Sequence, residues 1–235
     1  VYGLQNMTSV LKDSINTGAI FAAESMGKEQ FENYLQAFGF GETSGIELPG
    51  EVGGDLSSLI SGGDIYLATA SFGQGITVTP LQLISAYGAL ANGGKLMKPY
   101  VVEKIEFPNG EVIKGSKKEL RQVISPRAAA VLSGMLVEVV EDGHSKRAQV
   151  PGFYLGAKTG TAQVPDSVHG GYSSETIHTV VGYGPIRNAR FVILTRIDEP
   201  KDVQFAEGDA APLFGQIAEF LLHYLEIPPD YETNH

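Results

Sequence analysis

The chain contains no cysteine, so neither a disulfide bond nor thiol chemistry can contribute to its stability or activity. A cysteine-free composition suits an extracytoplasmic protein as well as a cytosolic one. Histidine is also sparse, with five residues, and no His-x-x-x-His pair or group of carboxylates has the spacing of a metal site. We therefore expect no metal and no cofactor.

Basic residues are outnumbered by acidic ones. Lys and Arg total 17 against 27 Asp and Glu, which gives a formal net charge of -10. A nucleic-acid surface needs a basic stripe, so we expect no nucleic-acid partner. The charge balance does not exclude a small anionic substrate, because one lysine can dominate the potential inside a cleft.

Long uninterrupted apolar runs are also lacking. Residues 66–94 carry no formal charge, but polar side chains, five glycines and Pro80 dilute them. We predict a buried loop and a core helix there rather than a membrane span. The 235 residues, 43% of them hydrophobic, suffice for one large core. No signal peptide opens the chain, and its first residues read as interior sequence, so we expect a piece of a longer protein.

The spacing of apolar residues predicts helices over 4–25 and 28–38, with a stop at Gly39, followed by a turn-rich surface loop over 39–63. Two further helices should begin at the dipeptides Thr79-Pro80 and Ser125-Pro126, because each supplies an N-cap and a first helical residue. They should end near Asn92 and Gly143. The inward residues of a terminal helix over 210–225 are expected to be Leu213, Phe214, Ile217, Leu221 and Leu222.

Strand signals dominate the last third of the chain. Residues 153–164, 178–184 and 190–197 are rich in β-branched and aromatic side chains. The short connection between the last two favours antiparallel pairing. A separate hairpin is predicted over 101–107 and 111–114, around Pro-Asn-Gly. Helices followed by consecutive strands and a covering helix indicate an α+β fold.

The sequence Lys158-Thr159-Gly160-Thr161 lies in the first of these strands. A lysine, hydroxyl groups and a glycine on a strand can offer an anionic ligand a positive charge, hydrogen-bond donors and close backbone approach. K-T-G is the third motif of penicillin-binding proteins and class A β-lactamases. By chance, roughly one chain in ten of this length would carry it, so the rest of the sequence must decide.

Two nucleotide-binding alternatives are weak. Residues 152–159 approach a phosphate-binding loop, but Ala157 replaces the required glycine and the residues that follow Lys158 do not predict a helix. Gly73-Gln74-Gly75 lacks the third glycine of a dinucleotide fingerprint, and a tight turn is the better interpretation.

A serine acyl-transfer site fits better, because Ser14-Ile15-Asn16 supplies the S-x-N motif that would accompany K-T-G. Residues 4–18 around it resemble the corresponding helix and turn of class B penicillin-binding proteins. The block from Ser71 to Gly94 is similar to the most recognisable segment of that family, and residues 158–163, 180–185, 210–214 and 227–230 match in order. The resemblance covers nearly the whole chain.

This resemblance implies a serine β-lactamase/D,D-peptidase-like fold, in which an antiparallel sheet is covered by helices on both sides. It implies a D,D-transpeptidase that cross-links peptidoglycan at D-Ala-D-Ala and is acylated by β-lactams. Ser14 would relay a proton to the leaving amine, Asn16 would bind a substrate peptide group, and Lys158 would polarise Ser14 and attract the terminal carboxylate. The substrate-binding residues would be Thr159, Gly160 and Thr161, with the Thr161 N–H in the oxyanion hole.

The family's first motif, S-x-x-K, is expected upstream of S-x-N. Ser9-Val-Leu-Lys12 has the right letters, but it lies inside the S-x-N helix and reads as a solvated helix face. Residues 1–235 are therefore expected to form a single partial transpeptidase domain without the nucleophile. Ala157, where the family favours glycine, should have little consequence. A non-catalytic β-lactam sensor or degenerate module on the same scaffold remains an alternative.

The resemblance also implies a setting: the extracytoplasmic face of a bacterial membrane, with an N-terminal anchor and a polytopic glycosyltransferase as partner. Other residues are expected to have structural roles. Phe72 and Ile76 should be core, and His178 should be a surface or packing histidine at a strand start. The turn at Gly170-Gly171 and the following Tyr172 are expected to rim the cleft.

Overall fold

The computed structural model describes residues 3–166 and 170–232. Its centre is an antiparallel sheet of β5 (Gly156–Pro165), β6 (Tyr172–Gly184) and β7 (Phe191–Asp198), in that order. All three predicted strands are present, and the antiparallel pairing of the last two is confirmed. β6 begins at Tyr172 rather than at His178, because residues 172–177 extend the ladder with β5 beyond the apolar part of the strand.

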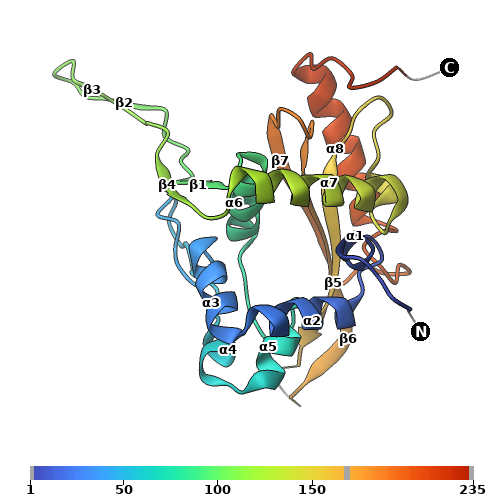
Figure 1. Ribbon diagram of the computed structural model, residues 1–235. Coiled ribbons are helices and arrows are strands. Elements are labelled where there is room, and N and C mark those ends of the chain that lie inside the picture. The colour runs from blue at the N-terminus through green and yellow to red at the C-terminus, as the bar shows by residue number, and fades with distance from the viewer. Residues whose placement is uncertain (1–2, 167–169, 233–235) are drawn as a thin grey trace.

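Helices cover both faces of this sheet (Figure 1). Side chains alternate along each strand, so Val180 and Ile193 pack with Phe214 of α8 (Ala210–Tyr224) on one face. Tyr183, on the opposite face, packs with Leu136 of α7 (Pro126–Asp142) and with residues of α6 (Pro80–Ala91). The predicted α+β class with an antiparallel sheet between helices is confirmed.

The two Pro-initiated helices begin where the sequence predicts. Thr79 forms a capping box with Gln82 at the start of α6, and the Ser125 hydroxyl accepts from the Ala128 N–H at the start of α7. α6 and α7 end at Asn92 and Gly143 as C-caps, as expected. In α8, Phe214 and Leu222 are buried as predicted, but Leu213 is 39% exposed, because it lies on the face of α8 turned away from the sheet.

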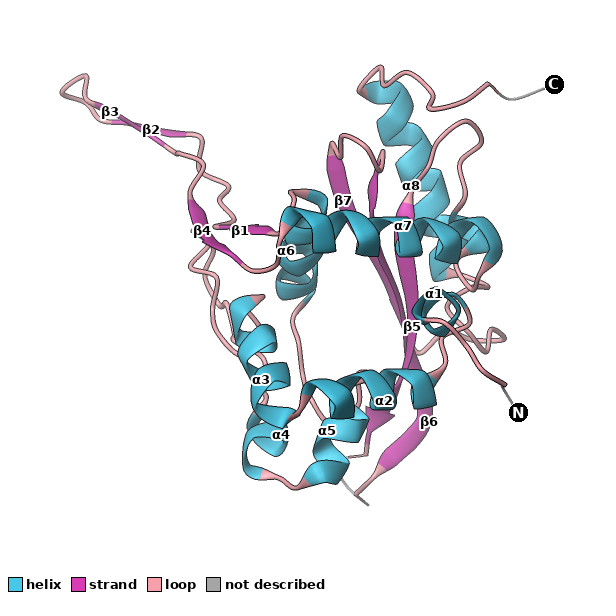
Figure 2. Cartoon of the chain, viewed as in Figure 1, coloured by secondary structure: helices cyan, strands magenta, loops and turns pink. Residues whose placement is uncertain are grey.

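A helical lobe lies at the other end of the sheet (Figure 2). It contains α2 (Asn16–Met26), α3 (Lys28–Ala37), α4 (Ser57–Ser61) and α5 (Asp64–Ala70), whose apolar side chains share a small core. α3 confirms the prediction, but α4 interrupts a segment that we expected to be loop. Ile76 packs against this core and is only partly buried, like Phe72.

The predicted helix over 4–25 is wrong as a single element. It consists of α1 (Met7–Lys12) and α2, separated by three residues around Ser14. Ser14 has a φ of 50°, in the left-handed region that no α-helix can contain. The break is therefore confined to the turn between the two helices.

A two-stranded arm projects away from the body of the molecule (Figure 1). Its base pairs β1 (Lys95–Met97) with β4 (Glu119–Gln122), and its tip is the predicted hairpin, β2 (Lys104–Glu106) with β3 (Val112–Lys114). One 3₁₀ turn, η1 (Lys146–Ala148), follows α7. Within the described parts of the chain, no helix is both long and apolar enough to cross a bilayer. The charge-free residues 66–94 contain most of α5, the whole of α6 and the loop between them.

Candidate active site

Ser14 is presented by the way α1 ends. The Ile15 N–H donates to the Val10 carbonyl at 2.9 Å and the Ser14 N–H to the Leu11 carbonyl at 3.3 Å, which is the bonding pattern of a Schellman motif. Ser14 therefore occupies the left-handed position where glycine is usual. Left-handed backbone costs a non-glycine residue about 1–2 kcal/mol, so the serine is held there at the expense of local stability.

Close packing fixes this turn on both sides. A Cβ on Gly18 would lie 2.5 Å from Val10 Cγ2, so only glycine lets the first turn of α2 lie against α1. The His144 N–H, just after α7, donates to the Lys12 carbonyl at 3.3 Å. Ile15 is buried at 6% exposure, and this anchor leaves its neighbours Ser14 and Asn16 exposed on the surface of the turn.

Lys158 reaches Ser14 from near the start of β5. Its Nζ donates to Ser14 Oγ at 3.0 Å and to the Thr159 carbonyl at 3.0 Å. Burial lowers the pKa of Lys158 to about 8, since little water remains to solvate its charge. In the described portion of the chain no carboxylate forms an ion pair with this ammonium, so an anionic ligand would be its natural counter-charge.

All six residues predicted for the site line one cavity of about 950 Å³. Ser14 and Asn16 come from the α1–α2 turn, whereas residues 158–161 come from β5, the outer strand of the sheet on this side. Tyr172 also lines the cavity, as expected, but Gly170 and Gly171 do not. The structure thus brings the two predicted motifs, far apart in the sequence, to facing walls of a single cleft.

Gly160 and Thr161 differ in how the protein constrains them. A Cβ built on Gly160 would meet only the Thr179 carbonyl, at 3.9 Å, so the fold itself leaves room for a side chain there. Thr161 Oγ1 accepts a hydrogen bond from the Ala206 N–H at 3.2 Å. With that lone pair engaged, the hydroxyl hydrogen of Thr161 remains free to donate to a ligand.

His178 is not at a strand start and is not on the surface. It lies inside β6, directly opposite Thr161, and is fully buried. Its Nδ1 contacts both carboxylate oxygens of Asp209, at 2.9 and 2.8 Å. Sequence reasoning missed Asp209 and the neighbouring cavity residues 205–207. The available signal was an aspartate immediately before a predicted helix, a common N-cap.

The structure also bears on the alternatives to a serine acyl-transfer site. Lys158 lies within a strand and no helix begins there, so the phosphate-loop alternative is wrong. Gly73 and Gly75 form turns ahead of α6, as the simpler interpretation predicted. Lys12 Nζ pairs with Asp142 Oδ2 at 3.0 Å, and neither Ser9 nor Lys12 lines the cavity. No group of three or more His, Cys, Asp or Glu side chains among residues 3–166 and 170–232 could hold a metal ion.

Known proteins share this arrangement. The three-layer architecture is that of the serine β-lactamase-like fold. The structure superposes on penicillin binding protein 3 from Mycobacterium tuberculosis complexed with aztreonam with a TM-score of 0.89 and 29% identity, over 96% of this chain and 53% of that one. For the transpeptidase domain of Burkholderia pseudomallei penicillin-binding protein 3, the TM-score is 0.84 and the identity 31%, over 98% and 68%.

Sequence comparison leads to the same family. Residues 1–219 match the model of the penicillin binding protein transpeptidase domain. Stage V sporulation protein D of Bacillus subtilis (strain 168) is 37% identical over 97% of this chain and 36% of its own length, and PbpB of Mycolicibacterium smegmatis is 32% identical over 95% and 36%. The chain belongs to the penicillin-binding protein transpeptidase family, class B. It spans little more than a third of the length of these relatives.

Proposed function

We propose that the protein to which this chain belongs is a peptidoglycan D,D-transpeptidase, which cross-links stem peptides by serine acyl transfer at D-Ala-D-Ala and is inhibited by β-lactams. The observation that carries the proposal is the 3.0 Å contact between Lys158 Nζ and Ser14 Oγ across the cleft. Two relatives from other organisms bear the name peptidoglycan D,D-transpeptidase FtsI or FtsI homolog, and one solved neighbour holds a β-lactam.

In this proposal Ser14 transfers a proton and Lys158 stabilises negative charge. The nucleophilic serine oxygen attacks the carbonyl carbon of the penultimate D-Ala, and the terminal D-Ala departs as an amine that needs a proton. The lysine of the S-x-x-K segment takes the proton from the nucleophilic serine and passes it to Ser14, which gives its own hydroxyl proton to the leaving amine. The neighbouring Lys158 ammonium polarises Ser14 at 3.0 Å. Lys158 also attracts the terminal carboxylate of the stem peptide, which explains why no protein carboxylate pairs with it in the described part of the chain.

The remaining site residues hold the substrate. Asn16 hydrogen-bonds a peptide group of the stem, and the Thr159 and Thr161 hydroxyls donate to its terminal carboxylate. The Thr161 N–H contributes half of the oxyanion hole. Gly160 keeps the strand surface flat so that the peptide can lie against it, in agreement with the open space above its Cα.

The nucleophile in this proposal comes from an S-x-x-K segment outside residues 1–235, so these residues form one part of a transpeptidase domain. Ser9 and Lys12 do not serve, because Lys12 is engaged with Asp142 and its pKa is raised by that contact. A charged lysine of this kind cannot take the proton of a serine.

The cellular setting follows from the same proposal. A transpeptidase of this family works on the extracytoplasmic face of the bacterial membrane, where peptidoglycan is built, in cell division, elongation or sporulation. We propose that a segment outside this chain anchors it there and that a polytopic membrane glycosyltransferase supplies the glycan strands.

The proposal is tested on a longer protein that contains the S-x-x-K segment together with residues 1–235. Fluorescent penicillin should form a covalent adduct with it, and Lys158→Ala should lower the acylation rate by about 100-fold or more, as expected for the loss of a preorganised charge. Normal labelling of the Lys158→Ala protein would remove the role given to Lys158. Residues 1–235 alone should not react, and an adduct on Ser9 in mass spectrometry would overturn the assignment of the nucleophile.

A further inference from the structure

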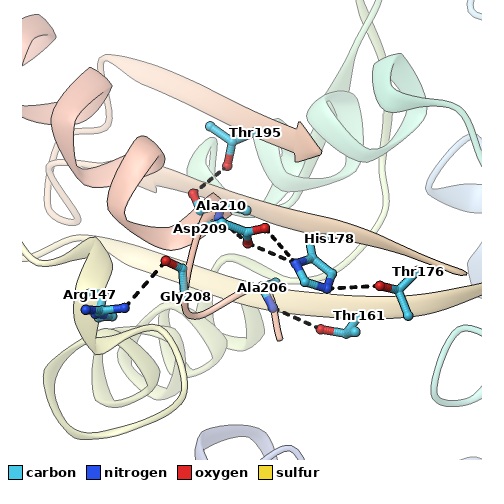
Figure 3. Close-up of polar contacts among 9 residues, drawn as sticks. All are labelled: Arg147, Thr161, Thr176, His178, Thr195, Ala206, Gly208, Asp209 and Ala210. Atoms are coloured by element: carbon cyan, nitrogen blue, oxygen red, sulfur yellow. Dashed lines mark hydrogen bonds and ion pairs between the residues drawn. The ribbon is translucent and has the colours of Figure 1, made fainter. Parts of the chain in front are cut away.

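The segment of residues 205–210, which leads into α8, is irregular in backbone but heavily bonded; we call it the lead-in segment. Each of its last five residues is bound by a side chain from a different part of the fold, and Figure 3 shows these contacts for Ala206, Gly208, Asp209 and Ala210. The contacts are Ala206 N–H to Thr161 Oγ1, Glu207 to His144, Gly208 carbonyl to Arg147, Asp209 to His178, and Ala210 carbonyl to Thr195.

His178 is fully buried, and its partner in this segment is the carboxylate of Asp209. Its ring is 0% exposed, and Asp209 is 14% exposed. Because an ionised carboxylate can only accept hydrogen bonds, Nδ1 carries a proton and donates to Asp209. Thr176 Oγ1 lies 3.1 Å from Nε2 and fixes the other side of the ring. Asp209 in turn accepts from the Ala210 N–H at 2.6 Å, so the pair also begins α8.

The pair lies next to Thr161 in two ways. His178 is the direct cross-strand neighbour of Thr161 in the β5–β6 ladder, so both side chains point to the same face of the sheet. Three residues before Asp209, the Ala206 N–H donates to Thr161 Oγ1. The position of Ala206 relative to β5 therefore depends on where Asp209 is held relative to β6.

We propose that His178 and Asp209 are a positioning pair for Thr161. The pair holds the lead-in segment in the position, relative to the sheet, in which the Ala206 N–H donates a hydrogen bond to Thr161 Oγ1. The Thr161 hydroxyl then has one orientation in which its hydrogen points into the cleft, towards the carboxylate of the substrate. This role rests on the proposed transpeptidase function, and neither residue touches the substrate.

Without the pair, the lead-in segment gains freedom and the Thr161 hydroxyl can turn to other partners. A misplacement of about 1 Å at a reacting site can cost on the order of 100-fold in rate. The Thr161 hydroxyl acts on the carboxylate, whereas the Thr161 backbone N–H is held in β5 and serves the oxyanion hole, so a loss confined to the orientation of the hydroxyl should be selective. It should affect ligands that carry the carboxylate and spare those that do not.

The test compares the acylation rate constants of the longer S-x-x-K-containing protein for benzylpenicillin and for its methyl ester, which lacks the carboxylate charge. His178→Val should lower the rate for the acid by about 10-fold or more, and the rate for the ester by less than about 2-fold. Val139→Ala, a buried change in α7 away from the cleft, is the control for lost stability. It should change both rates equally, if at all.

Two milder variants make the test independent of folding defects. An asparagine amide nitrogen can replace Nδ1, whereas a glutamine nitrogen reaches only the position of Nε2. His178→Asn should therefore keep the wild-type ratio of acid to ester rates, and His178→Gln should lose it. A His178→Val or His178→Gln protein with the wild-type ratio would overturn the positioning role. Failure of the wild-type protein to be acylated at all would instead refute the proposed function.

Discussion

The methyl group of Ala157 occupies the space that any side chain at Gly182 would need. The two residues are cross-strand partners, and a Cβ built on Gly182 would lie 2.5 Å from Ala157 Cβ. The family's usual glycine before the lysine is thus replaced here without harm, because the opposite strand carries a glycine. The face of the sheet directly behind Lys158 is closely packed as a result.

Gly182→Ala should destabilise the protein by about 1–3 kcal/mol, the usual cost of overpacking a core. Chemical denaturation measures this as a lower midpoint with an unchanged slope. The double variant Ala157→Gly with Gly182→Ala should recover only part of the loss, because the new Cβ would still lie 2.5 Å from the Gly156 carbonyl oxygen. Full recovery would mean that the backbone contact is unimportant.

Gly160→Ala should have the opposite profile. The new methyl group meets no atom closer than 3.9 Å, so the midpoint of denaturation should stay within about 0.5 kcal/mol of wild type. Acylation by penicillin should fall sharply, because the methyl group projects to where we propose that the substrate lies. Gly182→Ala is the matched control for an alanine on the neighbouring strand. Unimpaired acylation of the Gly160→Ala protein would show that ligands do not approach the strand at this point.

Ser14→Gly separates the hydroxyl group of Ser14 from its backbone conformation. Glycine adopts a φ of 50° without strain, so this variant should unfold at the wild-type midpoint or be stabilised by about 1 kcal/mol. Ser14→Ala keeps the strain and should gain nothing. Both variants lose the hydroxyl, so both should lose acylation alike. Unequal acylation of the two would mean that the turn, and not the hydroxyl, matters.

Lys158→Met should raise stability near neutral pH and lose that advantage in alkali. The folded-state pKa of Lys158, about 8, is below the ordinary value of 10.5. Between these two values the unfolded chain binds more protons, so the wild-type free energy of unfolding rises with pH across that window. At pH 7 the variant should be more stable by about 1 kcal/mol. The gain is this small because water still reaches part of the Lys158 ammonium group and limits the cost of its burial.

The control for this experiment is Lys12→Met. Contact with Asp142 raises the pKa of Lys12, so its charge favours the folded state and its removal should not stabilise the protein. Thermal melts of both variants at pH 7 and at pH 10 would decide. If Lys158→Met were less stable than wild type at pH 7, the burial of an unpaired charge would not be the dominant effect at this site.

Local chemistry explains which elements could be predicted from sequence. α6 and α7 were predictable because Thr79-Pro80 and Ser125-Pro126 each supply an N-cap and the first residue of the helix. The strand carrying Lys158 was predictable from its β-branched neighbours. Each of these signals consists of residues that are close together in the sequence, within a single helix or strand.

The features that escaped prediction depend on distant partners. The break at Ser14 places a serine in a conformation where glycine is usual, and the packing of Gly18 on Val10 and the bond from His144 to Lys12 help to hold it there. His178 was predicted only as a surface or packing histidine, because its partner Asp209 is 31 positions away in the sequence. The six residues predicted for the site nevertheless line one cavity, and the sequence could indicate them because each of the two motifs is contiguous in the chain.

The lead-in segment has a consequence for the exchange of amide hydrogens with solvent. Irregular segments usually exchange quickly, yet the Ala206 N–H bonds to Thr161, and the N–H groups of Gly208, Ala210 and Ala211 all have acceptors. The Ala206 amide should exchange as slowly as those of the sheet, because its acceptor is on β5 and it opens only when the lead-in segment separates from that strand. Its deuterium uptake therefore reports how long this wall of the cleft stays assembled.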